Sequence, residues 1–192
     1  MFHRGAIASI FLSLGLSAIS GAGGALKSGP QIGVEVPGPF HPLNVTGEHA
    51  GKKACLYCLN SGKPTAVVFA REATPAVANL LKQLDEATAK NDKAGMGSFA
   101  VFCSSSDGLD KQLEKLASTQ KLAKLVLSID NPAGPKGYDI AKDAEVTVLL
   151  YKTLDEKDGF TARVLANHAF RKGELNDSAI AKVVADVAKI VK

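Results

Sequence analysis

Short apolar runs separated by polar segments mark the strands of this chain. Runs of about four to eight residues bounded by turn residues predict strands that are buried on both faces. The last run follows the polar stretch TLDEKDGF, so we expect it to pair with its predecessor as a hairpin. The five predicted strands cover Thr65–Ala70, Ser98–Cys103, Lys124–Asp130, Glu145–Tyr151 and Thr161–Phe170.

Three further segments have apolar residues at every third or fourth position, the spacing that places them on one face of a helix. The first of these helices has Pro75 at its first position, where proline loses no hydrogen bond. Its apolar face carries Val77, Leu80, Leu81 and Leu84. A short helical turn is also expected around Tyr138–Ala141. The predicted N-caps are Thr74 for the first helix, Ser106 or Asp107 for the second, and Asn176 or Asp177 for the third.

These elements follow the order strand, helix, strand, helix, strand, strand, strand, helix. Strands that alternate with helices imply parallel crossovers, and the closing hairpin adds antiparallel pairing. The sequence therefore predicts an α/β fold, a three-layer sandwich whose mixed β-sheet has helices on both faces. A chain of 192 residues suits one domain. We place this domain at residues 34–192, after a flexible lead-in at residues 23–33 that is rich in glycine.

The N-terminal residues have the pattern of a secretory signal peptide. Arg4 supplies a positive charge, an apolar stretch runs from Ala6 to Ile19, and small residues follow. The apolar stretch is shorter than the ~20 residues that span a bilayer. We therefore expect residues 1–22 to be a signal peptide, cleaved between residues 20 and 25, and the mature protein to be secreted or periplasmic. The expected contact with a membrane is through this segment alone.

Charge and motif content exclude several classes of function. The chain has 23 Lys and Arg against 19 Asp and Glu, a net charge of +4, and these charges are interspersed rather than gathered in a basic stripe. We therefore expect no nucleic-acid partner. No glycine-rich phosphate loop is present, and no cofactor is expected.

Cys55 and Cys58 form a Cys-x-x-Cys motif just before the first predicted strand. Outside the cytosol such a pair is expected to be a disulfide. A ring this short opens and closes readily by exchange, and Lys52 and Lys53 would stabilise a thiolate, so the pair is a candidate redox centre for protein thiols and disulfides. Alternatively, the disulfide is structural and the protein is a non-catalytic module that binds a protein partner.

A metal site is a third interpretation of the same segment. His49, and His41 further upstream, could join Cys55 and Cys58 as ligands of zinc or copper(I). The spacing matches no recognised zinc finger, and oxidation of the two cysteines would remove their thiolates as ligands.

Three stretches of the chain resemble the thioredoxin-like superfamily, in particular its redoxin and peroxiredoxin branch. VPGPFHPLNVTG is similar to the beginning of the redoxin domain, and GKPTAVVFARE to the strand that leads to the family's active site. EVTVLLYKTLDEKDGF is similar to the strand and turn before the last hairpin strand. The resemblance covers residues 34–192 and implies a thioredoxin-like fold and thiol-disulfide chemistry.

The same resemblance implies that the usual active site is missing. Redoxins place a nucleophilic cysteine at the start of the helix after this strand, and here Thr74 and Val77 occupy the two matching positions. A hydroxyl cannot replace a thiolate in disulfide exchange or peroxide reduction. The family also has a cis-proline before the fourth strand, where this chain reads DAEVTVLL. The Cys-x-x-Cys motif is therefore a separate element at a different place.

Two other residues are of types that often act in functional sites, Cys103 and His168. Cys103 ends the second predicted strand, at the edge of the sheet where α/β folds often bind ligands, but a buried core cysteine is the favoured interpretation. His168 lies in the last predicted strand and is expected to be a partly buried, hydrogen-bonded histidine rather than a catalytic one.

Overall fold

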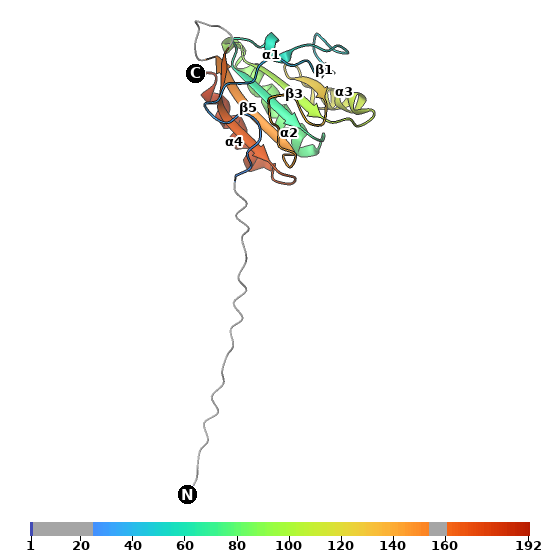
Figure 1. The fold of residues 1–192 in the computed structure, drawn as a ribbon. Helices are drawn as coiled ribbons and strands as arrows, with labels where there is room; N and C mark the ends of the chain where they lie inside the picture. Colours follow the sequence, from blue (N-terminus) through green and yellow to red (C-terminus); the bar gives the residue numbers. More distant parts are fainter. Residues whose placement is uncertain (2–24, 154–160) are drawn as a thin grey trace.

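A computed structural model describes Met1 and residues 25–153 and 161–192 of the chain (Figure 1). The predicted signal peptide, apart from Met1, and most of the polar turn before the last strand lie outside the described residues. Among those described, no helix is both long and apolar enough to cross a membrane.

Six strands form one mixed sheet in the order β1-β4-β3-β2-β5-β6. β2 and β3 are parallel, as are β3 and β4, whereas β1 with β4, β2 with β5 and β5 with β6 are antiparallel. The strands are β1 (Leu43–Asn44), β2 (Thr65–Ala70), β3 (Gly97–Cys103), β4 (Val126–Asp130), β5 (Val146–Thr153) and β6 (Ala162–Phe170). The mixed sheet of an α/β fold is thus confirmed, and so is the closing hairpin.

Three long helices cover one face of the sheet: α2 (Pro75–Lys90), α3 (Leu109–Gln120) and α4 (Asp177–Asp186). The predicted stripe on α2 is fully buried there, and α4 packs beside α2 (Figure 1). Thr74 caps α2 by accepting the Val77 N–H at 3.2 Å, as the sequence predicts. Asn176 caps α4 in the same way.

The opposite face carries the short helix α1 (Leu56–Leu59) together with irregular chain. Phe40 and Tyr138 meet there edge to face, with ring centroids 5.1 Å apart, above Phe69 of β2. The lead-in also packs on this side, because Ser28 is buried and its hydroxyl lies 2.6 Å from the Thr147 hydroxyl. The described part of the lead-in is therefore anchored by hydrogen bonds to the domain.

Three local details differ from the sequence-based expectations. The N-cap of α3 is Gly108, in the left-handed conformation and without a side-chain hydrogen bond, in place of Ser106 or Asp107. Residues Tyr138–Ala141 are a bend followed by irregular chain in place of a helical segment, and the Tyr138 ring is buried in the core. Two short 3-10 helices, Asp92–Ala94 and Val187–Lys189, were not expected.

Candidate functional site

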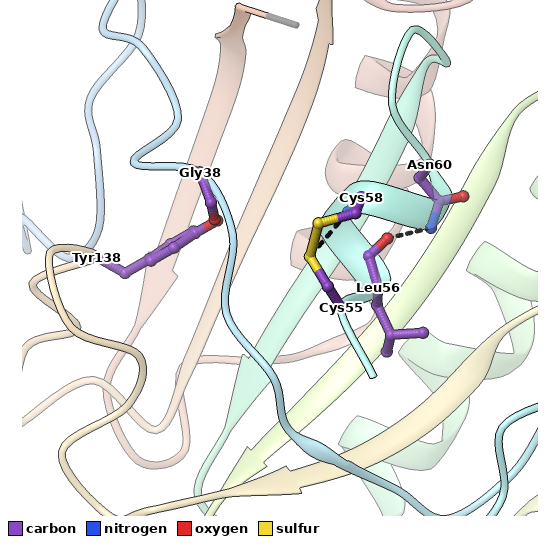
Figure 2. Close-up of a disulfide and its surroundings, with 6 residues drawn as sticks. All are labelled: Gly38, Cys55, Leu56, Cys58, Asn60 and Tyr138. Atoms are coloured by element: carbon purple, nitrogen blue, oxygen red, sulfur yellow. Dashed lines mark hydrogen bonds between the residues drawn. A yellow bond between two sulfur atoms is a disulfide. The ribbon is translucent and has the colours of Figure 1, made fainter. Parts of the chain in front are cut away.

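The candidate site is the Cys55–Cys58 disulfide, which spans the single turn of α1 (Figure 2). Cys55 is the N-cap of this turn, and its Sγ accepts the backbone N–H of Cys58 at 3.1 Å. The turn brings the two Cα atoms to 5.2 Å, within the range that a disulfide requires. One helical turn thus both closes the ring and supplies a donor to the Cys55 sulfur.

Both ends of α1 are fixed by specific contacts. Leu56 anchors the turn by burying its side chain in the core beneath it. Asn60 ends it, donating from Nδ2 to the Leu56 carbonyl at 2.8 Å (Figure 2). Gly97, the first residue of β3, makes room for this asparagine, because a Cβ there would overlap Asn60 Oδ1. The geometry of the cysteine pair therefore depends on a glycine of the central sheet.

The two sulfur-bearing residues differ in exposure. Cys55 is 8% exposed, whereas Cys58, on the outer side of the turn, is exposed. Thiol-disulfide exchange requires a thiolate to reach one sulfur of the disulfide. The arrangement therefore offers Cys58 to a partner and keeps Cys55 within the protein.

A groove with a volume of about 480 Å³ runs beside the disulfide. The carbonyl of Gly38 in its wall accepts a hydrogen bond from the Tyr138 hydroxyl at 2.8 Å, which holds the chain around Gly38 over the core (Figure 2). The ring of Tyr57 lies 6.0 Å from that of Tyr151, centroid to centroid. The residues that line the groove include Val36, Gly38, Pro39, Tyr57, Cys58 and Ser61.

Two lysines and two histidines were also predicted to act with the cysteine pair, and they differ in exposure. Lys52 and Lys53 are exposed on the preceding turn, so solvent screens their charges from a thiolate. His41 is exposed and His49 is half-buried. No three His, Cys, Asp or Glu residues of the described chain are placed to hold a metal ion, so the structure gives no support to the set of His49, Cys55 and Cys58.

Comparison with solved structures identifies the fold. A candidate protein disulfide isomerase from Bacteroides thetaiotaomicron matches with a TM-score of 0.60 at 15% identity, covering 86% of this chain and 94% of that one. The peroxidoxin BcpB from Mycobacterium tuberculosis matches with a TM-score of 0.56 at 14% identity, covering 86% and 98%. The chain has the thioredoxin-like fold.

A third similar structure belongs to a secreted protein. It is a secreted disulfide oxidoreductase of Mycobacterium tuberculosis, homologous to DsbE of Escherichia coli, with a TM-score of 0.50 at 13% identity and covering 78% of this chain and 95% of that one. No protein-family model matches the sequence, and the comparison with curated proteins finds no match. The likeness is therefore one of fold, and it confirms the fold that the sequence resemblance implies.

On this fold the cysteine pair and the usual redoxin position lie at opposite ends of β2. α1 precedes the amino end of the strand, whereas Thr74 follows its carboxyl end, and a strand of this length separates them by about 17 Å. Thr74 uses its hydroxyl as a helix cap and Val77 is buried. The described chain has no cis peptide, and Glu145 precedes β5 where redoxins have proline.

Cys103 is a free thiol in the core at the far end of β3, 3% exposed. Burial raises the pKa of this thiol to about 12, and the smaller opposing effect of the Arg71 charge does not offset it. The thiol is thus protonated at neutral pH, as the core interpretation of the sequence requires.

His168 is half-buried on β6, and its Nε2 lies 3.0 Å from Asp186 Oδ2 of α4. Burial lowers the pKa of His168, outweighing the opposite effect of the Asp186 carboxylate. This is the hydrogen-bonded histidine that the sequence predicts, and it ties the last strand to the last helix.

Sequence reasoning missed the residues that frame the disulfide. Gly97 lies just before the strand predicted at Ser98–Cys103, and no role was predicted for it or for Asn60. The local signal for Asn60 is an asparagine directly after a predicted helical turn, a position where its side chain caps carbonyls. The groove wall at Val36, Gly38 and Pro39 has no local signal, since it depends on Tyr138, which is 100 residues away from Gly38.

Proposed function

We propose that this protein is an exported thiol-disulfide oxidoreductase that works through Cys55 and Cys58, with protein thiols and disulfides as substrates. The observation that carries the proposal is the exposure of Cys58 in a disulfide ring that closes a single helical turn. The thioredoxin-like fold and the oxidoreductases among the similar structures support it.

The size of the ring argues against a purely structural role. A cross-link between residues three positions apart removes little freedom from the unfolded chain, so its contribution to stability is small. Cleaving it requires only the local turn to adjust. A redox role is thus compatible with a fold that stays intact in both oxidation states.

Insulin reduction by the dithiol form, with a thiol reductant as electron source, tests the proposal. Wild type should accelerate insulin precipitation over the reductant alone, and Cys55→Ser and Cys58→Ser should both abolish the acceleration. Cys103→Ala is the matched control, because it removes the buried cysteine and should leave the rate unchanged. Wild-type activity no greater than that of Cys55→Ser and Cys58→Ser would rule out the proposed function.

The competing proposal is a non-catalytic thioredoxin-like binding module. The burial of Cys55 favours it, as does the helix cap at Thr74 in the position of the usual catalytic cysteine. On that proposal the disulfide survives reductants that act on redox centres, and Cys55→Ser leaves partner binding intact. A peroxidase function is not proposed, because Thr74 lacks a thiol and the Cys103 thiol is buried.

Export is part of the proposal and rests on the N-terminal pattern, with support from the secreted oxidoreductase of similar fold. Full-length protein made in a bacterial host should appear in the extracytoplasmic fraction with a new N-terminus between residues 20 and 25. Replacing Leu12 and Leu14 with lysine should keep the chain uncleaved in the cytosol. Full-length protein that stays in the cytosol with its apolar segment intact would argue against export.

A further inference from the structure

We infer that Cys58, the second cysteine of the motif, is the sulfur that partner thiols attack, and that the adjacent groove receives an apolar side chain next to the partner's cysteine. The inference rests on the proposed function and assigns the roles of the two cysteines and the class of partner. It reverses the order of roles that thioredoxin-like redox motifs follow, in which the first cysteine attacks.

Exposure to solvent decides whether a partner thiolate attacks the sulfur of Cys55 or that of Cys58. An incoming thiolate must approach along the extension of the S–S bond, on the side away from the leaving sulfur. Cys58 is exposed, so a partner thiolate in solution can reach this residue directly. Attack on Cys55 would require entry into the protein, where the residue is 8% exposed and its neighbour Leu56 is 3% exposed.

The leaving sulfur is also favourably placed. When a partner thiolate bonds to Cys58 Sγ, the Cys55–Cys58 bond breaks and Cys55 departs as a thiolate. The Cys58 N–H, 3.1 Å from Cys55 Sγ, donates to that sulfur and stabilises its negative charge. The turn thus keeps a hydrogen-bond donor on the leaving sulfur.

The full exchange balances without any further oxidant. After the first step the partner is joined to Cys58 by a mixed disulfide. A second thiolate of the partner then attacks the partner's own sulfur in that bond and releases Cys58 as a thiolate. The partner dithiol has lost two electrons and two protons, which the two protein cysteines have gained, and the reverse sequence reduces a partner disulfide.

The residues that line the groove beside Cys58 indicate which kind of side chain the partner carries next to its cysteine. Its wall includes Val36, Pro39 and Tyr57, and its volume of about 480 Å³ accommodates a large apolar side chain with its backbone. Glu35, the charged residue among those that line it, already pairs with Arg163 at 3.2 Å. A polypeptide with an apolar residue beside its cysteine therefore fits the groove better than a small charged thiol does.

Mixed-disulfide mapping on the oxidised wild-type protein tests the inference without altering the fold. The probes are two tetrapeptide thiols that differ only in phenylalanine or serine after the cysteine. Acid quenching, alkylation of the released thiol and peptide mass mapping should place the probe on Cys58 and the alkyl group on Cys55. The phenylalanine probe should react about tenfold faster than the serine probe, because its ring is removed from water.

Two proline variants test the groove. Pro39→Glu places a charge in the groove wall and should abolish the preference for the phenylalanine probe. Pro37→Glu is the matched control, since this proline is also exposed, lies two residues away and is not among the residues that line the groove, and it should keep the preference. Equal effects of the two variants would overturn the role of the groove.

The outcomes separate the inference from the proposed function. A probe found on Cys55, with its alkyl group on Cys58, would overturn the inference and leave the exchange activity standing. No mixed disulfide with either probe, under conditions in which free glutathione disulfide reacts, would contradict the proposed function itself.

Discussion

At the scale of single residues, the environments of the three cysteines assign them different chemistry. Cys58 is exposed, Cys55 is covered but joined to it, and Cys103 lies free in the core. The thiolate is the reactive form of cysteine, and burial in apolar surroundings disfavours it. Cys103 is therefore separated from the candidate site by both position and protonation.

Cys103 should be inert in the folded protein. With a pKa of about 12 it carries about a thousandfold less thiolate at neutral pH than an ordinary cysteine. Labelling of the oxidised protein with a maleimide, followed by mass spectrometry, should show modification of Cys103 only in denaturant. Rapid labelling of native protein would show that this thiol is reachable and would return it to the list of candidate site residues.

The second residue-scale prediction concerns His168 and pH. Its pKa is lowered in the folded protein, so the unfolded chain takes up the proton first as the pH falls. The unfolding free energy therefore has its full contribution from neutral His168 above about pH 6.5, the pKa of an unfolded histidine. This contribution is lost as the pH falls below that value.

Urea unfolding at about pH 7.5 and about pH 5.5 measures this loss. His168→Gln retains a donor for Asp186 but does not titrate, so it should reduce the pH dependence of the unfolding free energy. An unchanged dependence in the variant would show that the loss comes from other groups.

At the scale of elements, the short helix α1 is coupled to the central sheet through Asn60 and Gly97. Asn60 caps the end of α1, and the absence of a side chain at Gly97 gives it room. The geometry of the disulfide is thus set by packing as well as by the helical turn itself. A substitution in the sheet at Gly97 should therefore alter the position of the two cysteines.

A double-mutant cycle measures that coupling. Gly97→Ala should lower the free energy of unfolding by about 2 kcal/mol, because the new methyl group displaces Asn60. In an Asn60→Ala background the same substitution should cost less than half as much, since nothing remains to be displaced. Additive effects would mean that the two residues act independently and that the sheet does not position α1.

At the scale of the whole molecule, periodic patterns predicted the strands and the long helices well. The burial of β2 on both faces and the stripe on α2 follow directly from residues such as Val68 and Leu80. The resemblance to redoxins correctly implied the fold, and Thr74 was correctly placed at the start of α2.

The irregular chain beside the disulfide could not be predicted from local sequence. It is held by contacts between distant segments, such as the hydrogen bond from Tyr138 to Gly38 and the packing of Phe40 on Phe69. No periodic pattern in a four-residue motif distinguishes its first sulfur from its second.

The reduction potential of the Cys55–Cys58 disulfide tests the central claim most directly. Equilibration with glutathione buffers, acid quenching and counting of alkylated thiols by mass spectrometry would measure it, with Cys103→Ala as the background. The redox proposal predicts a potential within the range of thiol-disulfide oxidoreductases, about −120 to −270 mV. A potential below about −300 mV, as structural disulfides have, would contradict it and leave the binding module as the better account.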